Sequence, residues 1–235
     1  MPPVGARRPQ PYEPGRSTTV NTAATALKRT GEPRLRADAL RNRERIVAAA
    51  REMFVEHGAD VSLDEVARRA GVGNATLYRH FADRQELVRR VTLYVTHRIT
   101  DQAEAALAEE ADGYEALRRF VHAVVDERVG ALCTMLAGTA EERGEHTEAR
   151  ERLEGAVERI MASARDCGRL RADVEFGDLM VALTQLTRPL PNSGCLNFDR
   201  FAHRHLQLFL DGLHTPARSE LPGSAVTLED LRQRP

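Results

Sequence analysis

Residues 70–87 read AGVGNATLYRHFADRQEL, with two glycines directly before a short run of polar and aromatic residues. Just upstream, Ser62 begins a short helix and is followed three residues later by a glutamate, as in a capping box. Gly71 ends this helix, and a very short link leads to a second helix at 74–81. Helices joined this closely need a small residue where they touch and a residue that tolerates positive φ at the turn. The pattern therefore predicts a helix-turn-helix motif over residues 62–81.

The second helix of this motif carries more polar groups than a buried helix accepts. Leu77 and Phe81 are four residues apart and face inward, so the residues around them face out. Gly73 leaves the N-terminus of this helix free to approach a phosphate oxygen. Amide, hydroxyl, guanidinium and phenol groups reach base edges and phosphates in a major groove, although the same residues could form a solvated face. The polar residues are Asn74, Thr76, Tyr78, Arg79 and His80.

The rest of the chain shows helical periodicity and no alternating strand pattern. Its 235 residues, 42% hydrophobic and 5% aromatic, suffice for one large domain or two small ones. We therefore expect an all-α protein. We expect one helix to begin at residue 40 and another at residue 83. Further helices are expected at 114–137, 148–167, 176–187 and 198–213, with a short turn at 228–231.

The N-terminal segment 1–37 holds six of the eleven prolines and few periodic apolar residues. Such a segment buries too little surface to offset its ordering entropy, so we expect a disordered basic tail, with a phosphate-seeking arm as the alternative. The expected organisation after it is a domain with the helix-turn-helix at 38–98, a helical domain at 99–213, and a C-terminal tail at 214–235.

Charge is distributed unevenly along the chain. Residues 1–91 contain 17 Lys and Arg against 11 Asp and Glu, and residues 92–235 contain 17 against 24. This asymmetry suggests that only the first part meets a polyanion. No run approaches the roughly 18 apolar residues of a membrane span.

The cysteines and the other reactive residues give no indication of catalytic activity. Cys133, Cys167 and Cys195 are widely spaced, so reduced thiols in a cytoplasmic protein are expected, with a redox-sensing cysteine as the alternative. His203 and His205 lie on different sides of a helix and cannot share a metal, whereas Asp199 could pair with His203. The chain has no Gly-rich phosphate loop, no Gly-x-Ser-x-Gly and no His-Glu-x-x-His. We expect no catalysis, no cofactor and no metal.

The segment VSLDEVARRAGVGNATLYRHFADRQEL at 61–87 resembles the DNA-binding domain of the TetR/AcrR family of bacterial transcriptional regulators. The match is close over about residues 40–95, and the remaining helices match only in general form. The matching residues are Ala67, Gly71, Val72, Thr76, Leu77, Tyr78, His80 and Phe81.

The resemblance implies a role for each residue of the motif. Asn74 and Thr76 would contact bases or adjacent phosphates, and Arg79 could do either. Gly73 stands where the family often has serine, so its contact would come from the backbone N–H. The residues implied to hold phosphates are Tyr78, His80, Arg84 and Ser62.

The resemblance also implies partners: DNA for the domain at 38–98, and effector binding and dimerisation for the domain at 99–213. The family dimerises through its last two long helices, here 176–187 and 198–213, whose apolar content exceeds one core-facing stripe. The expected protein is a repressor that binds a palindromic double-stranded operator as a homodimer and is released by a small-molecule effector. The alternative is a helical interaction or ligand-binding protein whose DNA binding is weakened.

Overall fold

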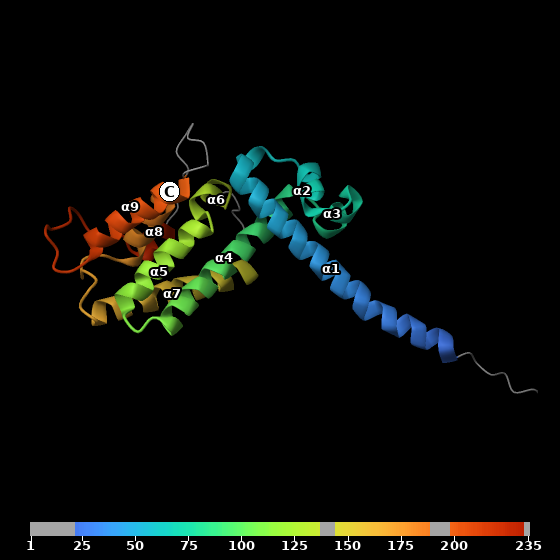
Figure 1. Cartoon of the computed structure of the whole chain (residues 1–235), viewed down its shortest axis with the longest axis horizontal. Helices are drawn as coiled ribbons and strands as arrows, with labels where there is room; N and C mark the ends of the chain where they lie inside the picture. The colour runs from blue at the N-terminus through green and yellow to red at the C-terminus, as the bar shows by residue number, and fades with distance from the viewer. Residues whose placement is uncertain (1–21, 137–143, 189–197, 233–235) are drawn as a thin grey trace, which may run out of the picture. The chain divides into compact units, whose positions relative to one another are not determined.

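The structure is a computed structural model of the chain that describes residues 22–136, 144–188 and 198–232. In these ranges the regular backbone is helical, apart from one isolated strand-like bridge (Figure 1). The prediction of an all-α protein is confirmed. Residues from Asn42 onward form one compact unit, and the chain up to Arg41 forms another.

The helices follow the predicted order, and most of their ends differ by a few residues; the exceptions are the start of α1 and the division of the helix expected at 114–137. Helix α9 has the expected bounds, and α7 and α8 shift slightly at their ends, where helices fray. The elements are α1 (Thr22–His57), a 3-10 turn η1 (Gly58–Asp60), α2 (Leu63–Ala70), α3 (Asn74–His80), α4 (Arg84–Glu109), α5 (Gly113–Asp126), α6 (Val129–Leu136), α7 (Glu145–Asp166), α8 (Phe176–Leu186), α9 (Phe198–Leu213) and α10 (Leu228–Arg232).

Helix α1 begins at Thr22, well before residue 38, where the ordered chain was expected to start. The structure thus differs from the expected tail in residues 22–37, while residues 1–21 of that tail lie outside the described residues. The segment TAATALKR at 22–29 is rich in strong helix formers. A helix already nucleated downstream extends through such residues at little cost.

The single helix expected at 114–137 is divided into α5 and α6. The break lies at Glu127 and Arg128, and Arg128 takes a left-handed φ of 55°. Glu127 is only 4% exposed, and its Oε1 accepts hydrogen bonds from Arg98 Nε and Nη2 of α4 at 2.8 and 2.6 Å. Its Oε2 lies 3.0 Å from Arg51 Nη2 of α1. Because a desolvated carboxylate needs cationic partners, these contacts hold the chain in the break, which no glycine or proline marks in the sequence.

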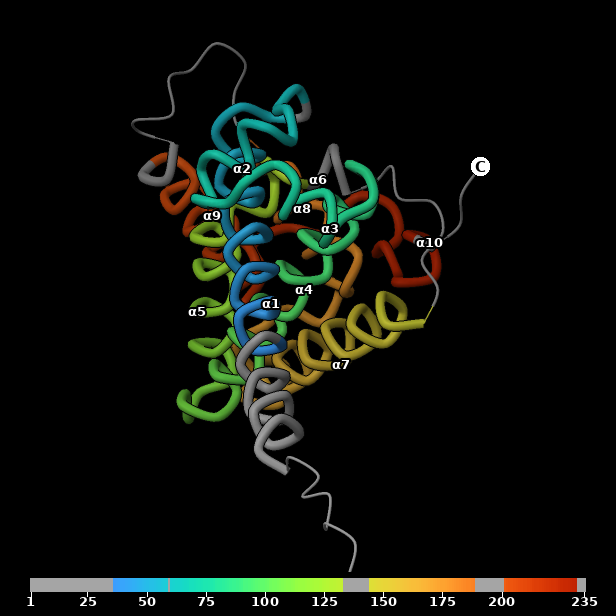
Figure 2. Tube along the Cα trace, turned by 90° about the vertical axis from the view of Figure 1, so that its right-hand side faces the viewer, coloured from blue at the N-terminus to red at the C-terminus, as the bar shows by residue number. Residues whose placement is uncertain are grey.

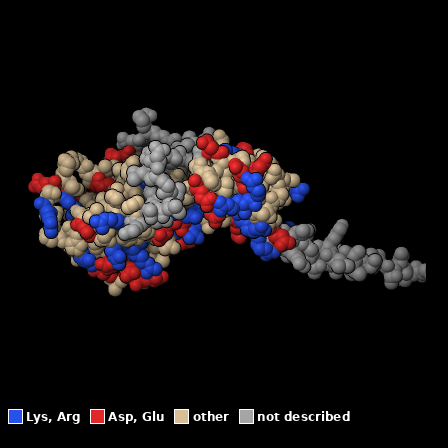
Figure 3. Space-filling model, turned by 45° about the horizontal axis from the view of Figure 1, so that its top comes forward, with Lys and Arg blue, Asp and Glu red and all other residues tan. Residues whose placement is uncertain are grey.

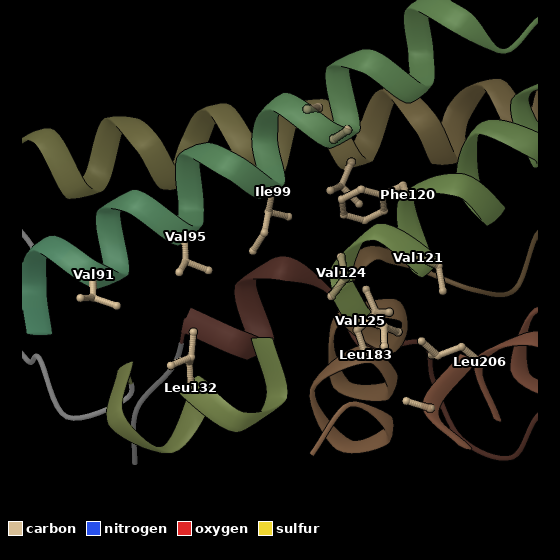
Figure 4. Packing of buried hydrophobic residues seen from close by; sticks show 14 of the residues in the cluster. Val91, Val95, Ile99, Phe120, Val121, Val124, Val125, Leu132, Leu183 and Leu206 are labelled. Atoms are coloured by element: carbon tan, nitrogen blue, oxygen red, sulfur yellow. The ribbon is translucent and has the colours of Figure 1, made fainter. Parts of the chain in front are cut away.

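Helices α4, α5 and α7 pack against one another, and α5 also packs against α9. Figure 1 shows α4, α5 and α7 side by side, and Figure 2 shows α7 next to α4 in a view turned by 90°. Apolar residues of α4, α5 and α8 converge in the core, as Figure 4 shows for Ile99, Phe120, Val124 and Leu183. One hydrophobic cluster runs from Ile46 to Leu213. The boundary expected at residue 98 therefore falls inside α4 and inside a shared core.

The segment after α9 is tied to the N-terminal end of α8. Val226 N donates to Asp178 Oδ1 at 3.1 Å, and a Cβ atom on Gly177 would lie 2.3 Å from Val226 O. Arg171 also donates to the carbonyl oxygen of Ser219 at 2.9 Å. The described part of 214–235 is thus packed on the bundle, which differs from the expected tail.

We expect the Glu127→Gln variant to lose about 3 kcal/mol of unfolding free energy, because two guanidinium groups then lack a buried counter-charge. Urea unfolding followed by circular dichroism measures this loss. Glu104→Gln is the matched control, since the ion pair of Glu104 with Arg152 is exposed and should contribute less than about 1 kcal/mol. Equal losses in the two variants would contradict a special role for Glu127.

Candidate nucleic-acid interface

The turn between α2 and α3 is built by local signals that the sequence contains. The Ser62 hydroxyl accepts from Glu65 N at 3.2 Å, and Ser62 N donates to Glu65 Oε2 at 2.9 Å, which completes the capping box. Gly71 ends α2 in the left-handed region with φ 64°, and Val72 N donates to Ala67 O at 3.0 Å. The predicted helix-turn-helix is confirmed.

Helix α3 has one buried anchor and an exposed polar face. Leu77 and the following Phe81 are completely buried in the core. Tyr78 is 51% exposed, and Asn74 and Arg79 are also exposed. Because burial of Leu77 fixes the rotation of the helix about its axis, these three side chains project away from the core. Gly73 is exposed before them, and Thr76 and His80 are half-buried at the edges of this face.

Two of the predicted contact residues are engaged within the domain. The Ser62 hydroxyl donates to Glu65 Oε2 at 2.7 Å. This hydroxyl and the Ser62 backbone N–H hold the carboxylate, and the backbone hydrogen bond is the larger cause of the lowered pKa of Glu65. The guanidinium of Arg84 donates to the carbonyl oxygen of Val61, and its centre lies 5.3 Å from the ring centroid of Phe54. Both side chains therefore already stabilise the ends of α2 and α4.

Arg45 of α1 is a supporting residue that the sequence analysis did not single out. Its Nη2 donates to Ala70 O at 2.5 Å and lies 3.3 Å from Gly71 O, so it holds the C-terminal end of α2. A Cβ atom on Gly71 would lie 2.9 Å from the same nitrogen. Arg45 and Ala70 are far apart in the sequence, and no spacing rule connects them. The turn glycine is therefore needed for its positive φ, whereas the arginine nitrogen, at the end of a flexible side chain, could move to admit a Cβ atom.

The basic excess of the first part of the chain is partly neutralised in the structure. Arg69 pairs with Glu52 at 3.1 Å and with Glu56. Arg43 lies 3.8 Å from Glu86 and stacks over Phe81. Figure 3 shows positive and negative side chains interspersed on the visible face rather than one basic patch. The net positive charge that this part of the chain could present to a polyanion is therefore smaller than its count of Lys and Arg suggests.

Helix α4 connects the interface to the bundle. The Arg98 guanidinium on this helix is held by Glu127, and this hydrogen bond raises the pKa of Arg98. Its centre also lies 5.8 Å from the ring centroid of Tyr94. Through Arg51 the same carboxylate reaches α1, which carries Arg45. The carboxylate at the α5–α6 break thus contacts both α4 and α1.

The described residues contain neither a helix that could span a membrane nor a cluster of side chains that could hold a metal ion. None of their helices combines the length and apolar character required to cross a bilayer. No group of three or more His, Cys, Asp or Glu side chains in these ranges is arranged to hold a metal ion. Cys167 Sγ bonds to Ala164 O, whereas the side chains of Cys133 and Cys195 lie outside the described residues.

Two family models match the chain. The model for bacterial regulatory proteins of the TetR family covers residues 46–91, which include α2, α3 and the beginning of α4. The model for the C-terminal domain of SbtR-like transcriptional regulators covers residues 112–215.

Solved structures match over most of their length. The TetR transcriptional regulator SCO0520 from Streptomyces coelicolor is 30% identical, with a TM-score of 0.57 over 74% of this chain and 99% of that chain. The TetR transcription regulatory protein from Mycobacterium vanbaalenii is 33% identical, with a TM-score of 0.57 over 77% of this chain and 99% of that chain.

A curated HTH-type transcriptional regulator of Staphylococcus aureus strain USA300 is 38% identical over 69 residues, or 27% of this chain. The match spans 37% of the length of that relative.

We expect Arg45→Ala to destabilise the α2–α3 turn by about 1–3 kcal/mol, because Ala70 O then loses a charged donor. Thermal unfolding of the full chain measures the loss. Arg68→Ala is the matched control, since Arg68 is an exposed arginine on α2 itself. If the two variants unfold alike, the Arg45 contact does not support the turn.

Proposed function

The chain belongs to the TetR family of transcriptional regulators, and we propose that it is a ligand-responsive repressor that binds a palindromic DNA operator as a homodimer. The observation that carries this proposal is the exposed polar face of α3 on its buried anchor Leu77. A short rigid helix with an amide, a phenol and a guanidinium on one side suits a major groove.

Two kinds of contact follow from the positions of these side chains. Asn74 and Thr76, in the first turn of α3, read base edges, because recognition helices use their N-terminal residues for this purpose. Tyr78 and His80 hold phosphates, and Arg79 contacts either a base or a phosphate. Gly73 contributes a backbone N–H beside Asn74.

Ser62 and Arg84 act mainly by positioning in this proposal. Their polar groups already bond to Glu65 and to the carbonyl of Val61. A phosphate contact by either residue would have to share or replace these bonds, which reduces its net contribution. The residues that are exposed on α3 therefore carry most of the affinity.

Dimerisation would explain the apolar residues that remain exposed on α8 and α9. Val181 of α8 is 44% exposed, and Phe201 and Leu208 of α9 are 53% and 59% exposed. A second copy that covers this face would bury them and would present two α3 helices. Since one bidentate base contact supplies only about 1–3 kcal/mol of discrimination, two half-sites are needed for a specific operator.

Release by a small molecule would act through the bundle. An effector lowers operator affinity only if it binds the conformation with weak DNA affinity more tightly than the conformation with strong DNA affinity. The ratio of these two effector affinities limits the size of the effect. Glu127 offers a route for such coupling, because its ion pairs join the α5–α6 break to α4 and α1.

A second candidate function is a helical ligand-binding protein with weakened DNA binding. Glu65 and the exposed Asp64 stand at the start of α2, and they would repel nearby phosphates. The salt dependence of binding to random duplex DNA separates the two candidates. Phosphate contacts give a linear fall of log affinity with log salt, and their absence gives a flat line.

We expect Tyr78→Ala to weaken binding to all sequences alike, because a phosphate contact carries no sequence information. Asn74→Ala should instead change base preference at one operator position by about 1–3 kcal/mol. Selection from a random DNA pool followed by fluorescence anisotropy measures both effects. Arg159→Ala, at an exposed position on α7, is the control and should bind as the parent does. Unchanged binding in both α3 variants would rule out this face.

We expect Leu208→Glu and Phe201→Glu to convert the dimer into monomers, because a buried unpaired carboxylate is costly in an apolar contact. Analytical ultracentrifugation of the full chain measures the change in mass. Leu221→Glu is the control, since Leu221 is 45% exposed but lies after α9. A wild-type monomer, or α9 variants that remain dimeric, would contradict the proposed dimer face.

A further inference from the structure

Two histidines from distant parts of the chain meet between α5 and α9. His122 Nδ1 and His203 Nδ1 are 2.8 Å apart, while the ring centroids are 5.1 Å apart and the ring planes differ by 26°. The nitrogens thus lie between the two ring centres, and the rings meet end to end. This arrangement fits one N–H···N hydrogen bond in the common plane of the rings.

The outer nitrogen of His122 faces an acceptor. His122 Nε2 lies 3.3 Å from Gln207 Oε1, and Gln207 Nε2 donates to Asp211 Oδ1 at 2.8 Å. The carboxylate of Asp211 therefore fixes the amide of Gln207 with its oxygen towards His122. An amide oxygen only accepts, so His122 carries its proton on Nε2, and its Nδ1 presents a lone pair to His203.

The outer nitrogen of His203 faces a carboxylate. His203 Nε2 lies 3.3 Å from Asp126 Oδ1, which favours a proton on that nitrogen. With that proton, a neutral His203 would present a second bare Nδ1, and two lone pairs 2.8 Å apart would repel. We propose that the pair holds one additional proton between its Nδ1 atoms, and that this imidazolium–imidazole bond is a pH-sensitive latch between α5 and α9.

The charged groups around the pair favour one positive charge and oppose a second. The groove beside it is lined by Gln102 of α4, by Glu110, and by Arg118, Arg119 and Asp126, with Asp211 reached through Gln207. Arg118 pairs with Glu115, and Arg119 pairs with Glu109 and Glu110. The Asp126 carboxylate balances the shared proton, whereas Arg118 repels another one.

Protonation of the second imidazole breaks the latch. Burial lowers the pKa of His122, and the charges of His203 and Arg118 lower it further, while Gln207 and Asp126 oppose this shift. Folded His122 therefore resists a proton that the unfolded chain accepts as pH falls below about 6.5, so stability declines there. With two protons bound, one N–H faces another, and the bond between α5 and α9 is lost.

The latch also bears on regulation, and this step rests on the proposed function. Helix α9 carries Phe201 and Leu208, two of the residues assigned to the dimer face. Loss of the bond between α9 and α5 at acidic pH would therefore weaken the dimer. The affinity of the dimer for the operator would fall with it. The proton acts in this way as an effector of the repressor.

The first experiment measures thermal midpoints of the full chain between about pH 7.5 and about pH 5.5. In His203→Gln an amide can donate to His122 Nδ1 without taking up a proton. We expect the wild type to lose about 2–4 °C less than His203→Gln over this range, because the folded pair already holds a proton, whereas His122 of the variant stays neutral in the fold and takes up a proton only on unfolding. His205→Gln is the matched control, because His205 bonds to Phe201 O on the same helix and should keep the wild-type profile. Parallel profiles of wild type and His203→Gln would overturn the latch.

The second experiment observes the protons directly. Long-range proton–nitrogen correlation spectra of the histidine rings at neutral pH should show three protons on the pair: one on each Nε2 and one between the two Nδ1 atoms. Two neutral rings would overturn the shared proton. Neither experiment uses DNA, so a chain that binds no operator would refute the proposed function and leave the latch to be decided by these two readouts.

Discussion

The buried carboxylate of Glu127 is the contact on which the arrangement of the helices depends. It binds Arg98 of α4 and lies against Arg51 of α1, at the point where α5 gives way to α6. A charge that has been removed from water is stable only where its cationic partners are held in place. One buried charge therefore joins these three helices, and α1 also carries Arg45, which bonds to the C-terminal end of α2.

The polar side chains of the candidate interface fall into two groups with different physical roles. Ser62, Arg45 and Arg84 bond within the domain and hold the ends of α2 and α4. Asn74 and Tyr78 are exposed on α3 and remain available to a partner. Internal bonds of the first group lower the ordering cost of binding, because the recognition helix is already in place.

Helix α9 serves several contacts at once. Leu206 and Leu210 are completely buried in the bundle, while Leu208 projects outward. Its side towards α5 carries His203, whose bond to His122 is polar and depends on a proton. The apolar packing of α9 does not depend on pH, whereas the bond between the two imidazoles does. One helix is therefore attached to the bundle by a contact that is independent of pH and by a contact that depends on it.

Local signals in the sequence were sufficient to predict the helical class, the α2–α3 turn and the outward residues of α3. These features depend on neighbours within a few positions: Ser62 caps α2, Gly71 ends it, and Leu77 sets the rotation of α3. The engagement of Arg84 within the domain and the end of α5 at Glu127 became visible only in the packed fold. The partners of Arg84 and Glu127 come from distant segments of the chain. Which charged side chains become buried, and which opposite charges then lie beside them, depends on how those segments pack, and no local pattern in the sequence encodes this.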